Sequence, residues 1–302
     1  MRDQFARTVA RIMRDNPHIV VLLGDIGRYT FRETFEKFPD RIYDVGINEQ
    51  AMIGMAAGLA KEGLLPIVYT IAPFLVERAY EQIMIDLGYQ RLKAILVSTG
   101  AAYDYSRMGS THHCPADLSL MLNIPEMGVL VPGTAGEATH LFGHAVRGDR
   151  SYYIRLSDFP NSESFLSRPG RARIIKEGRS DVVVFVVGTA LREVLPAVEG
   201  LDVTVLYYST LRPFDRVTLQ RVCVRGTKLV IVEPSYSSIV TEIVLTLPPP
   251  VSLTICAIPC RFITEYGSFD ELNQSVGLGA QSIRRRIEEV LHGTAPVPHP
   301  WD

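Results

Sequence analysis

The sequence predicts an α/β protein built from two doubly wound domains, the first with a mostly parallel sheet and the second smaller. Short runs of β-branched residues alternate with amphipathic segments of helical length, which is the pattern of parallel strands joined by helices. The alternation stops near residue 158 and resumes near residue 180. A chain of 302 residues is long enough for two hydrophobic cores.

Nearly continuous apolar runs predict the strands of the first domain, because parallel strands are buried on both faces of a sheet. These runs are residues 19–23, 67–71 and 94–98, and a further strand is expected at 152–156. Amphipathic segments at 48–62 and 74–87 predict helices. Gly63 and Gly88 follow them, where a left-handed residue commonly ends a helix.

The second half of the chain repeats this pattern. Strands are expected at 181–187, 203–207, 228–232 and 253–257, and a last helix at 281–291. Between the halves, a segment with polar residues, Pro, Gly and Arg lacks periodicity. We therefore divide the chain into a first domain of residues 1–160, a linker of 161–178 and a second domain of 179–302. The prolines at 248–250 predict a stiff surface turn, and the proline-containing C-terminal tail is expected to wrap a surface.

The composition excludes several classes of protein. With 31 Lys and Arg against 33 Asp and Glu, the net charge is −2 and no basic face is indicated, so no nucleic-acid partner is expected. The N-terminus does not resemble a signal peptide, and apolar runs such as residues 182–187 are too short to span a membrane. The four cysteines have no CxxC spacing and are expected to be reduced and buried. We expect a cytoplasmic protein that does not bind a membrane.

Glu49 lies where a strand gives way to a helix. The strand is expected to end near Gly46, Asn48 is a favourable N-cap, and Glu49 opens the helix. Open α/β sheets bind ligands at the carboxyl ends of their strands, so Glu49 is a candidate site residue. Alternatively, it only complements the positive end of the helix dipole.

A loop containing two histidines precedes a helix expected to begin at Pro115. Histidine titrates near neutral pH, so His112 or His113 could transfer a proton or stabilise an oxyanion. Either could instead be an ordinary solvated loop residue. Together with Cys114 they could suggest a metal site, but adjacent residues cannot easily share one ion and no third group of ligands is visible. We therefore predict no metal site.

Two arginines and one glycine-containing loop complete the candidates. Arg155 ends a predicted strand, where its guanidinium could bind a phosphate through two hydrogen bonds or pair with an acid. Arg78 is expected to pair with Glu81 on a helix surface. The chain has no P-loop and no GxGxxG. The loop at residues 24–27 begins Gly-Asp but lacks a glycine at the third position, and no downstream Asn is placed to bind the magnesium of a diphosphate. A complete diphosphate site on this chain is not apparent.

Taken together, these segments resemble the C-terminal part of transketolase-type, thiamine-diphosphate-dependent enzymes, over nearly the whole chain. Each motif alone is weak evidence, but their order and spacing together are specific. The motifs are Phe38-Pro39-Asp40-Arg41, Gly46-Ile47-Asn48-Glu49-Gln50, Pro73-Phe74, Arg78-Ala79-Tyr80-Glu81-Gln82, Gly109-Ser110-Thr111-His112-His113, Ile124-Pro125-Glu126-Met127 and Leu211-Arg212-Pro213-Phe214-Asp215. The resemblance implies a pyrimidine-binding domain followed by a transketolase C-terminal domain.

Enzymes of this kind have a third module, a diphosphate-binding domain with a GDG…N motif that holds diphosphate and Mg²⁺. This chain resembles only the other two modules. The resemblance therefore implies a split enzyme, in which a companion subunit supplies the missing module. Thiamine diphosphate would bind between the subunits, the companion would hold most of the Mg²⁺ coordination, and the assembly would be α₂β₂.

The resemblance also implies roles around the cofactor. Glu49 matches the glutamate that hydrogen-bonds the aminopyrimidine ring nitrogen and favours its imino tautomer. Phe74 matches the aromatic residue that packs against the aminopyrimidine. Asp25 and Ile26 match an acid and an apolar wedge near the thiazolium.

On the substrate side, His112 matches a histidine that touches the substrate oxygens, and Arg155 matches an arginine that binds the phosphate of a sugar. The chain departs from the family pattern nearby. Met108 stands where transketolases have an aspartate, and Gly100 and Ala101 stand near a position used for substrate by a histidine or arginine. The resemblance therefore implies an active site in which the half that binds the cofactor is intact and the half that binds the acceptor is altered.

The resulting hypothesis is a subunit that helps transfer a two-carbon ketol unit from a ketose phosphate to a non-standard acceptor. The alternatives are the beta subunit of a 2-oxoacid dehydrogenase-type decarboxylating component, transfer of the unit to a carrier-bound thiol, and a scaffold without activity. The Gly-Ser-Thr-His-His loop favours the transketolase reading over the dehydrogenase. The sequence assigns no role to His113 or Cys114.

Overall fold

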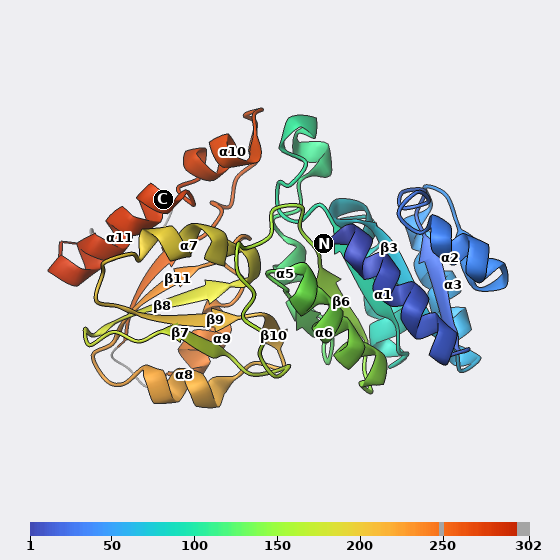
Figure 1. Cartoon of the computed structure of the whole chain (residues 1–302), viewed down its shortest axis with the longest axis horizontal. Helices are drawn as coiled ribbons and strands as arrows, with labels where there is room; N and C mark the ends of the chain where they lie inside the picture. The colour runs from blue at the N-terminus through green and yellow to red at the C-terminus, as the bar shows by residue number, and fades with distance from the viewer. Residues whose placement is uncertain (248–250, 295–302) are drawn as a thin grey trace.

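A computed structural model describes residues 1–247 and 251–294 of the chain. It contains two mostly parallel β-sheets that lie side by side, each flanked by helices (Figure 1). The prediction of two α/β domains with mostly parallel sheets is confirmed. The turn predicted at 248–250 and the proline-containing tail lie outside the described residues.

The first sheet has seven strands in the order β10–β5–β6–β4–β3–β1–β2. Neighbouring strands are parallel, except that β10 is antiparallel to β5. The strands are β1 (Ile19–Leu23), β2 (Ile42–Asp44), β3 (Leu65–Ile71), β4 (Ile95–Thr99), β5 (Gly128–Leu130), β6 (Tyr152–Arg155) and β10 (Thr210–Arg212).

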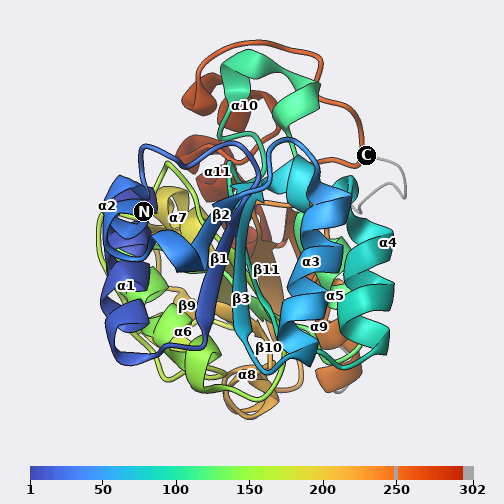
Figure 2. The ribbon, with the colours of Figure 1, turned by 90° about the vertical axis from the view of Figure 1, so that its right-hand side faces the viewer.

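Helices cover both faces of this sheet (Figure 2). One face carries α1 (Arg2–Asp15), α2 (Arg32–Lys37) and α6 (Ala135–Arg147); the other carries α3 (Glu49–Lys61), α4 (Tyr80–Gln82) and α5 (Asp117–Asn123). Phe5 of α1 packs edge-on against Phe142 of α6 in the first core. Met52 and Ile53 of α3 belong to the core on the opposite face. The sheet is therefore doubly wound, as predicted.

The second sheet has five strands in the order β12–β11–β8–β9–β7, and all pairs are parallel except β7 with β9. Its strands are β7 (Arg173–Lys176), β8 (Val182–Val187), β9 (Thr204–Tyr208), β11 (Lys228–Val232) and β12 (Ser252–Cys256). Its helices are α7 (Leu191–Ala197), α8 (Arg216–Val222), α9 (Val240–Thr246), α10 (Phe269–Ser275) and α11 (Ala280–His292). One hydrophobic core contains residues of both sheets, such as Leu22 of β1 and Phe185 of β8, so the two domains pack together.

The segment expected as a linker, residues 161–178, contains one strand that the sequence analysis did not predict. β7 lies within it and pairs with β9 at the edge of the second sheet. Its residues are exposed or half-buried, so the segment lacks the apolar run of a central strand. β10 is a second difference, because it follows β9 in the chain but pairs with β5 of the first sheet.

The helix predicted at 74–87 is present but is largely π-helical, as η2 (Pro73–Glu77), α4 and η3 (Ile83–Tyr89). Gly63 has a φ of +81°, as a left-handed helix end requires. Gly88 instead lies inside η3, and a Cβ there would be 2.9 Å from Ile124 Cγ2, so this glycine permits close packing. The helix expected from Pro115 begins two residues later, as α5.

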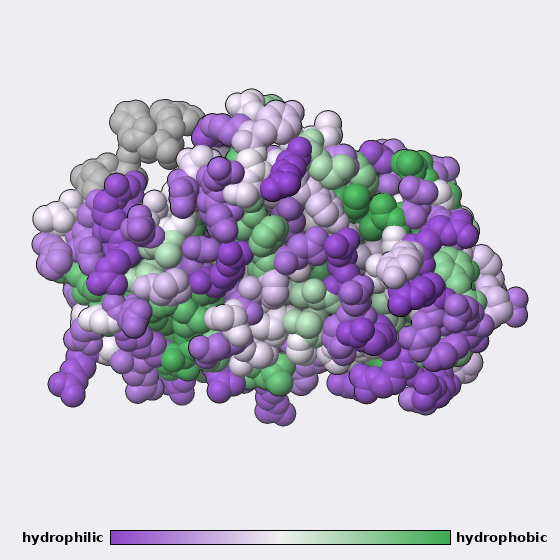
Figure 3. Space-filling model, turned by 45° about the horizontal axis from the view of Figure 1, so that its top comes forward, coloured by the Kyte–Doolittle hydropathy of each residue, from purple (hydrophilic) through white to green (hydrophobic). Residues whose placement is uncertain are grey.

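Within residues 1–247 and 251–294, no helix has the length and apolar character needed to cross a membrane. The face in Figure 3 is mostly hydrophilic, with hydrophobic residues scattered across both domains. Cys114, Cys223 and Cys256 are buried, as predicted. Cys260 is exposed, contrary to the prediction, because it lies in a loop after β12.

The parallel strands β1 to β4 end at one edge of the first sheet, toward the top of Figure 2. The segments that follow these strands carry Asp25 on a loop, Glu49 at the start of α3, Phe74 in a π-helical turn and His112 in a 3₁₀ turn. These are four of the predicted site residues, and they lie where open α/β sheets bind ligands.

Candidate active site

Glu49 is a buried carboxylate at the start of α3, with 1% of its surface exposed. Its Oε2 accepts a hydrogen bond from Arg78 Nη1 at 2.7 Å. Its Oε1 is buried and has no hydrogen-bond partner in the described ranges. A buried, unpartnered oxygen is costly, so its presence indicates a ligand or water at this atom.

Arg78 is a site residue that the sequence analysis missed. It was expected to pair with Glu81, but it pairs with Glu49, and its guanidinium lies 4.3 Å from the centre of the Phe74 ring. The π-helical turn explains this, because the Arg78 N–H donates to the carbonyl of Pro73 at 3.1 Å. The wider turn places Phe74 and Arg78 above one another at the end of β3.

Asn48 occupies the N-cap position of α3 as predicted, but its side chain makes no capping hydrogen bond within the described residues. The carboxylate of Asp44 instead organises this edge of the sheet. Its Oδ1 accepts from the backbone N–H groups of Asp25 and Gly46, both at 3.0 Å. Asp44 therefore ties the loop after β1 to the loop after β2.

Asp25 and Ile26 lie on the first of these loops. Asp25 is exposed, with a φ of +66°. Ile26 is half-buried and packs against the core beneath the sheet. A Cβ at the preceding Gly24 would lie 2.9 Å from Thr70 Oγ1, so the loop fits closely against β3. Both residues lie at the same sheet edge as Glu49.

His112 completes a chain of contacts that begins at Glu49. It ends a short 3₁₀ turn, η5 (Ser110–His112), and its ring meets the Phe74 ring edge-on with centroids 5.3 Å apart. On its other side lies the ring of Tyr105, at 6.3 Å. Its Nδ1 pairs with Thr111 Oγ1 at 2.9 Å, which fixes the ring orientation. Glu49, Arg78, Phe74 and His112 thus form one continuous group.

The second domain holds the histidine loop in place. Ser110 Oγ donates to the carbonyl of Ile263 at 2.9 Å. The ring of Tyr266 lies against Gly109, whose φ is +76°. The position of His112 therefore depends on a loop more than 150 residues later in the chain.

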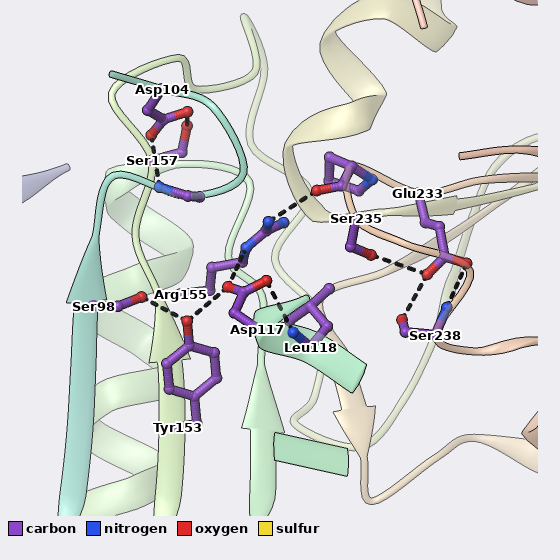
Figure 4. A network of polar contacts seen from close by, with 12 residues as sticks. Ser98, Asp104, Asp117, Leu118, Tyr153, Arg155, Ser157, Glu233, Ser235 and Ser238 are labelled. Atoms are coloured by element: carbon purple, nitrogen blue, oxygen red, sulfur yellow. Dashed lines mark hydrogen bonds and ion pairs between the residues drawn. The ribbon is translucent and has the colours of Figure 1, made fainter. Parts of the chain in front are cut away.

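Arg155 is not part of this group. It is 2% exposed, and its Nε donates to Asp117 Oδ2 at 2.7 Å (Figure 4). The Tyr153 hydroxyl donates to the same oxygen at 2.7 Å, and Arg155 Nη2 donates to the carbonyl of Pro234 at 2.8 Å. Of the two roles predicted for Arg155, the structure shows the pairing with an acid. Arg155 Nη1 is buried and has no hydrogen-bond partner in the described part of the chain, so a phosphate could reach it only if the surrounding side chains moved.

Two further buried carboxyls flank this network (Figure 4). Asp104 accepts from Ser157 Oγ and from the backbone N–H of Asp158, and burial raises its pKa to about 7. Glu233 accepts from the hydroxyls of Ser235 and Ser238, and burial raises its pKa to about 7. In both cases desolvation outweighs the hydrogen bonds, which favour the ionised form.

His113 and Cys114, to which the sequence assigned no role, are both buried. Neither ring nitrogen of His113 has a hydrogen-bond partner in the described part of the chain, and burial, followed by the nearby His112, lowers its pKa. Burial, followed by Asp117, raises the pKa of the Cys114 thiol well above its usual value. Cys114 is therefore poorly suited to act as a nucleophile. Met108 is 55% exposed.

The group formed by Glu49, Phe74 and Arg78 fits the aminopyrimidine that the sequence resemblance implies. Glu49 Oε1 is a buried acceptor in need of a donor, and the half-buried Phe74 ring offers an apolar surface beside it. Arg78 occupies the other carboxylate oxygen, so the donor must approach Oε1.

Comparisons with known proteins identify the relatives of this chain. Residues 1–158 match the family described as the transketolase pyrimidine-binding domain. The chain is 36% identical to an uncharacterised 33.6 kDa protein in the fasciation locus of Rhodococcoides fascians, over 96% of this chain and 95% of that protein. It is 28% identical to the 6-deoxy-6-sulfo-D-fructose transketolase subunit SqwH of a Clostridium species, over 96% and 94% of the two chains.

Longer relatives and a solved structure also match. The chain is 30% identical to the 1-deoxy-D-xylulose-5-phosphate synthase of Magnetococcus marinus over 95% of its length, but it spans only 48% of that protein. A solved structure described as a split gene transketolase, an inactive beta4 tetramer, superposes with a TM-score of 0.83 at 28% identity, covering 96% of this chain and 98% of the other. The match over half of the chain and the relatives of 30% identity or more lead to one conclusion: the chain belongs to the transketolase family.

Proposed function

We propose that this chain is one subunit of a split, thiamine-diphosphate-dependent transketolase that transfers a two-carbon ketol unit from a ketose phosphate to an acceptor. The observation that carries the proposal is the Glu49 carboxylate, with Oε2 held by Arg78 and Oε1 buried without a partner in the described residues. A structural glutamate would have both oxygens satisfied or exposed.

Each residue of the group has a part in this activity. When bound, thiamine diphosphate supplies the electron sink for the transferred unit. Glu49 Oε1 accepts a hydrogen bond from the aminopyrimidine ring, and Arg78 prevents the carboxylate from rotating away. Phe74 excludes water from the ring face. Asp25 and Ile26, on the loop after β1, would lie beside the thiazolium, a role that rests on the sequence resemblance.

His112 acts on the substrate. Because Nδ1 pairs with Thr111, Nε2 is the atom that we assign to the substrate oxygens. In the proposed transfer, the donor bond between the carbonyl carbon and the adjacent hydroxyl-bearing carbon breaks; that hydroxyl loses a proton, and the rest of the donor leaves as an aldehyde. A new carbon–carbon bond forms at the acceptor carbonyl carbon, and the acceptor oxygen takes up one proton, so the protons balance. Arg155 would bind the sugar phosphate through Nη1, which is buried and has no hydrogen-bond partner in the described residues, while its Nε stays paired with Asp117.

A companion subunit would supply the diphosphate-binding domain and most of the Mg²⁺ coordination, in an α₂β₂ assembly located in the cytoplasm. Exposed apolar side chains on and beside α3 support a partner here, namely Ile47, Met55, Met84, Ile85 and Tyr89. The similar beta tetramer is described as inactive, which agrees with a need for a companion.

The first test is a calorimetric titration of thiamine diphosphate and Mg²⁺ into the chain alone. We expect no binding until a subunit with the GDG…N motif is added. Tight binding to the chain alone would refute the shared site. In the two-subunit enzyme, Glu49→Ala should lower turnover at least about 100-fold. If the chain were only a scaffold for the companion subunit, this substitution would leave turnover unchanged.

A further inference from the structure

A cavity of about 420 Å³ lies between the histidine loop and the second domain. Its apolar wall consists of Tyr105, Met108, Phe159 and Phe269, and we call it the Met108 pocket. Phe159 and Phe269 come from different domains and stack with centroids 3.9 Å apart and planes within 11°. The volume is in the range of pockets that bind small organic molecules.

The Met108 pocket adjoins the candidate active site. The Tyr105 ring lines the pocket on one side and meets the His112 ring on the other, with centroids 6.3 Å apart. His112 in turn contacts Phe74. A molecule whose reacting end lies beside His112 could therefore extend a substituent past Tyr105 into the pocket.

Several polar groups of the pocket already bond within the chain. Asp104 accepts three hydrogen bonds, from Ser157 Oγ and from the N–H groups of Ala101 and Asp158. Ser268 Oγ donates to Glu271, and Asp270 pairs with Arg192 at 2.9 Å. Ser106 and Arg107 complete the lining and could exchange hydrogen bonds with a ligand. Most of the remaining wall is aromatic rings and Met108, against which a polyhydroxylated chain would lose hydration, so this wall favours an apolar substituent.

We propose that the Met108 pocket binds an aromatic or branched aliphatic substituent of the carbonyl acceptor. The inference rests on the proposed function and names the class of acceptor for it. Met108 offers an unbranched, polarisable side chain that adapts to apolar groups. Phe269 and Tyr105 supply the flat surfaces against which an aromatic ring packs.

Binding can be tested without catalysis, using unreactive probes and the chain alone. The ¹³C-methyl signals of methionine would be followed by NMR during titration with 2-phenylethanol or erythritol, and Met108→Leu would assign the Met108 signal. We expect 2-phenylethanol to shift this signal saturably and erythritol to leave it unchanged. An equal or larger shift with erythritol would overturn the proposal.

Variants locate the binding. Met108→Asp should weaken 2-phenylethanol binding at least about tenfold, because it places a charge against the apolar group. Met108 is largely exposed, so the change should not affect folding, and Phe269→Ala provides a second variant. Val244→Asp, at an exposed apolar residue outside the pocket, is the matched control and should leave binding unchanged. Binding that is insensitive to both pocket variants would refute the pocket.

In the two-subunit enzyme, Met108→Asp should lower kcat/KM for phenylacetaldehyde relative to erythrose at least about tenfold. An unchanged ratio would overturn the assignment of the pocket to the acceptor. If the enzyme transferred the unit to no aldehyde, the proposed function would fail, while the titrations would still decide whether the pocket binds apolar groups.

Discussion

Arg78 neutralises a carboxylate that the fold has buried, so its replacement by alanine tests how the candidate site is held together. The change removes the charged partner of Glu49 Oε2, which lies 2.7 Å from Arg78 Nη1, and the cation that lies over the Phe74 ring. The buried carboxylate would then have neither oxygen satisfied within the described part of the chain.

The size of the effect follows from the exposure of the two partners. An exposed ion pair contributes about 0–1 kcal/mol, and removing one partner of a fully buried pair costs about 3–5 kcal/mol. The Glu49 side chain is 1% exposed and that of Arg78 is 38% exposed, so water reaches the arginine but not the carboxylate. We therefore expect an intermediate loss of about 2 kcal/mol. For a chain of 302 residues this lowers the melting temperature by about 3 °C.

Thermal unfolding followed by circular dichroism measures this loss. Arg216→Ala is the control, because Arg216 pairs with Glu242 at 2.8 Å while both side chains remain accessible to water, and it should cost less than about 1 kcal/mol. If the two variants melted at the same temperature, the Glu49–Arg78 pair would be an ordinary surface contact and the reasoning would be wrong.

Three further predictions concern the buried groups and the thiols. Asp117→Ala should lower the free energy of unfolding in urea by about 3–5 kcal/mol, because it leaves Arg155 buried without its carboxylate. The double variant Asp117→Leu with Arg155→Met should recover most of this loss, and a single variant as stable as the parent would contradict the pairing. Burial raises the pKa of Asp104 and of Glu233 to about 7, so their contribution to stability should be complete below about pH 4 and decline as the pH rises to about 7. Asp104→Asn and Glu233→Gln should make this decline shallower in urea unfolding at several pH values, and an unchanged slope would refute the assignment. Ellman's reagent should modify Cys260 rapidly and the three buried cysteines only on unfolding. Rapid reaction of a second thiol would show that one of those three cysteines is accessible to solvent.

The sequence predicted well the features that depend on continuous local patterns. The apolar runs of β1, β3, β4 and β8 appear as central strands, because a strand buried on both faces shows its burial in every residue. Glu49 could be placed at the end of a strand for the same reason. Edge strands such as β7 give a weaker signal, since their residues are only partly buried.

The contacts of the site depended on information that the sequence pattern does not carry. Spacing along an ordinary α-helix pairs Arg78 with Glu81. The π-helical turn after β3 changes the direction of the Arg78 side chain and brings it to Glu49, 29 residues earlier. The burial of Arg155 depends on the carbonyl of Pro234 in the second domain, which no local pattern could indicate.

The pairing of β10 with β5 has a consequence for how the chain folds. The three residues of β10 lie between two strands of the second sheet in the chain, β9 and β11, yet they cover the edge of the first sheet. Arg212 also donates to the carbonyls of Leu122 and Ile124 at the end of α5. A fragment ending at residue 160 would expose the unpaired edge of β5 and would tend to associate through it. The two domains should therefore unfold as one cooperative unit, and neither half should be expected to behave as an independent module.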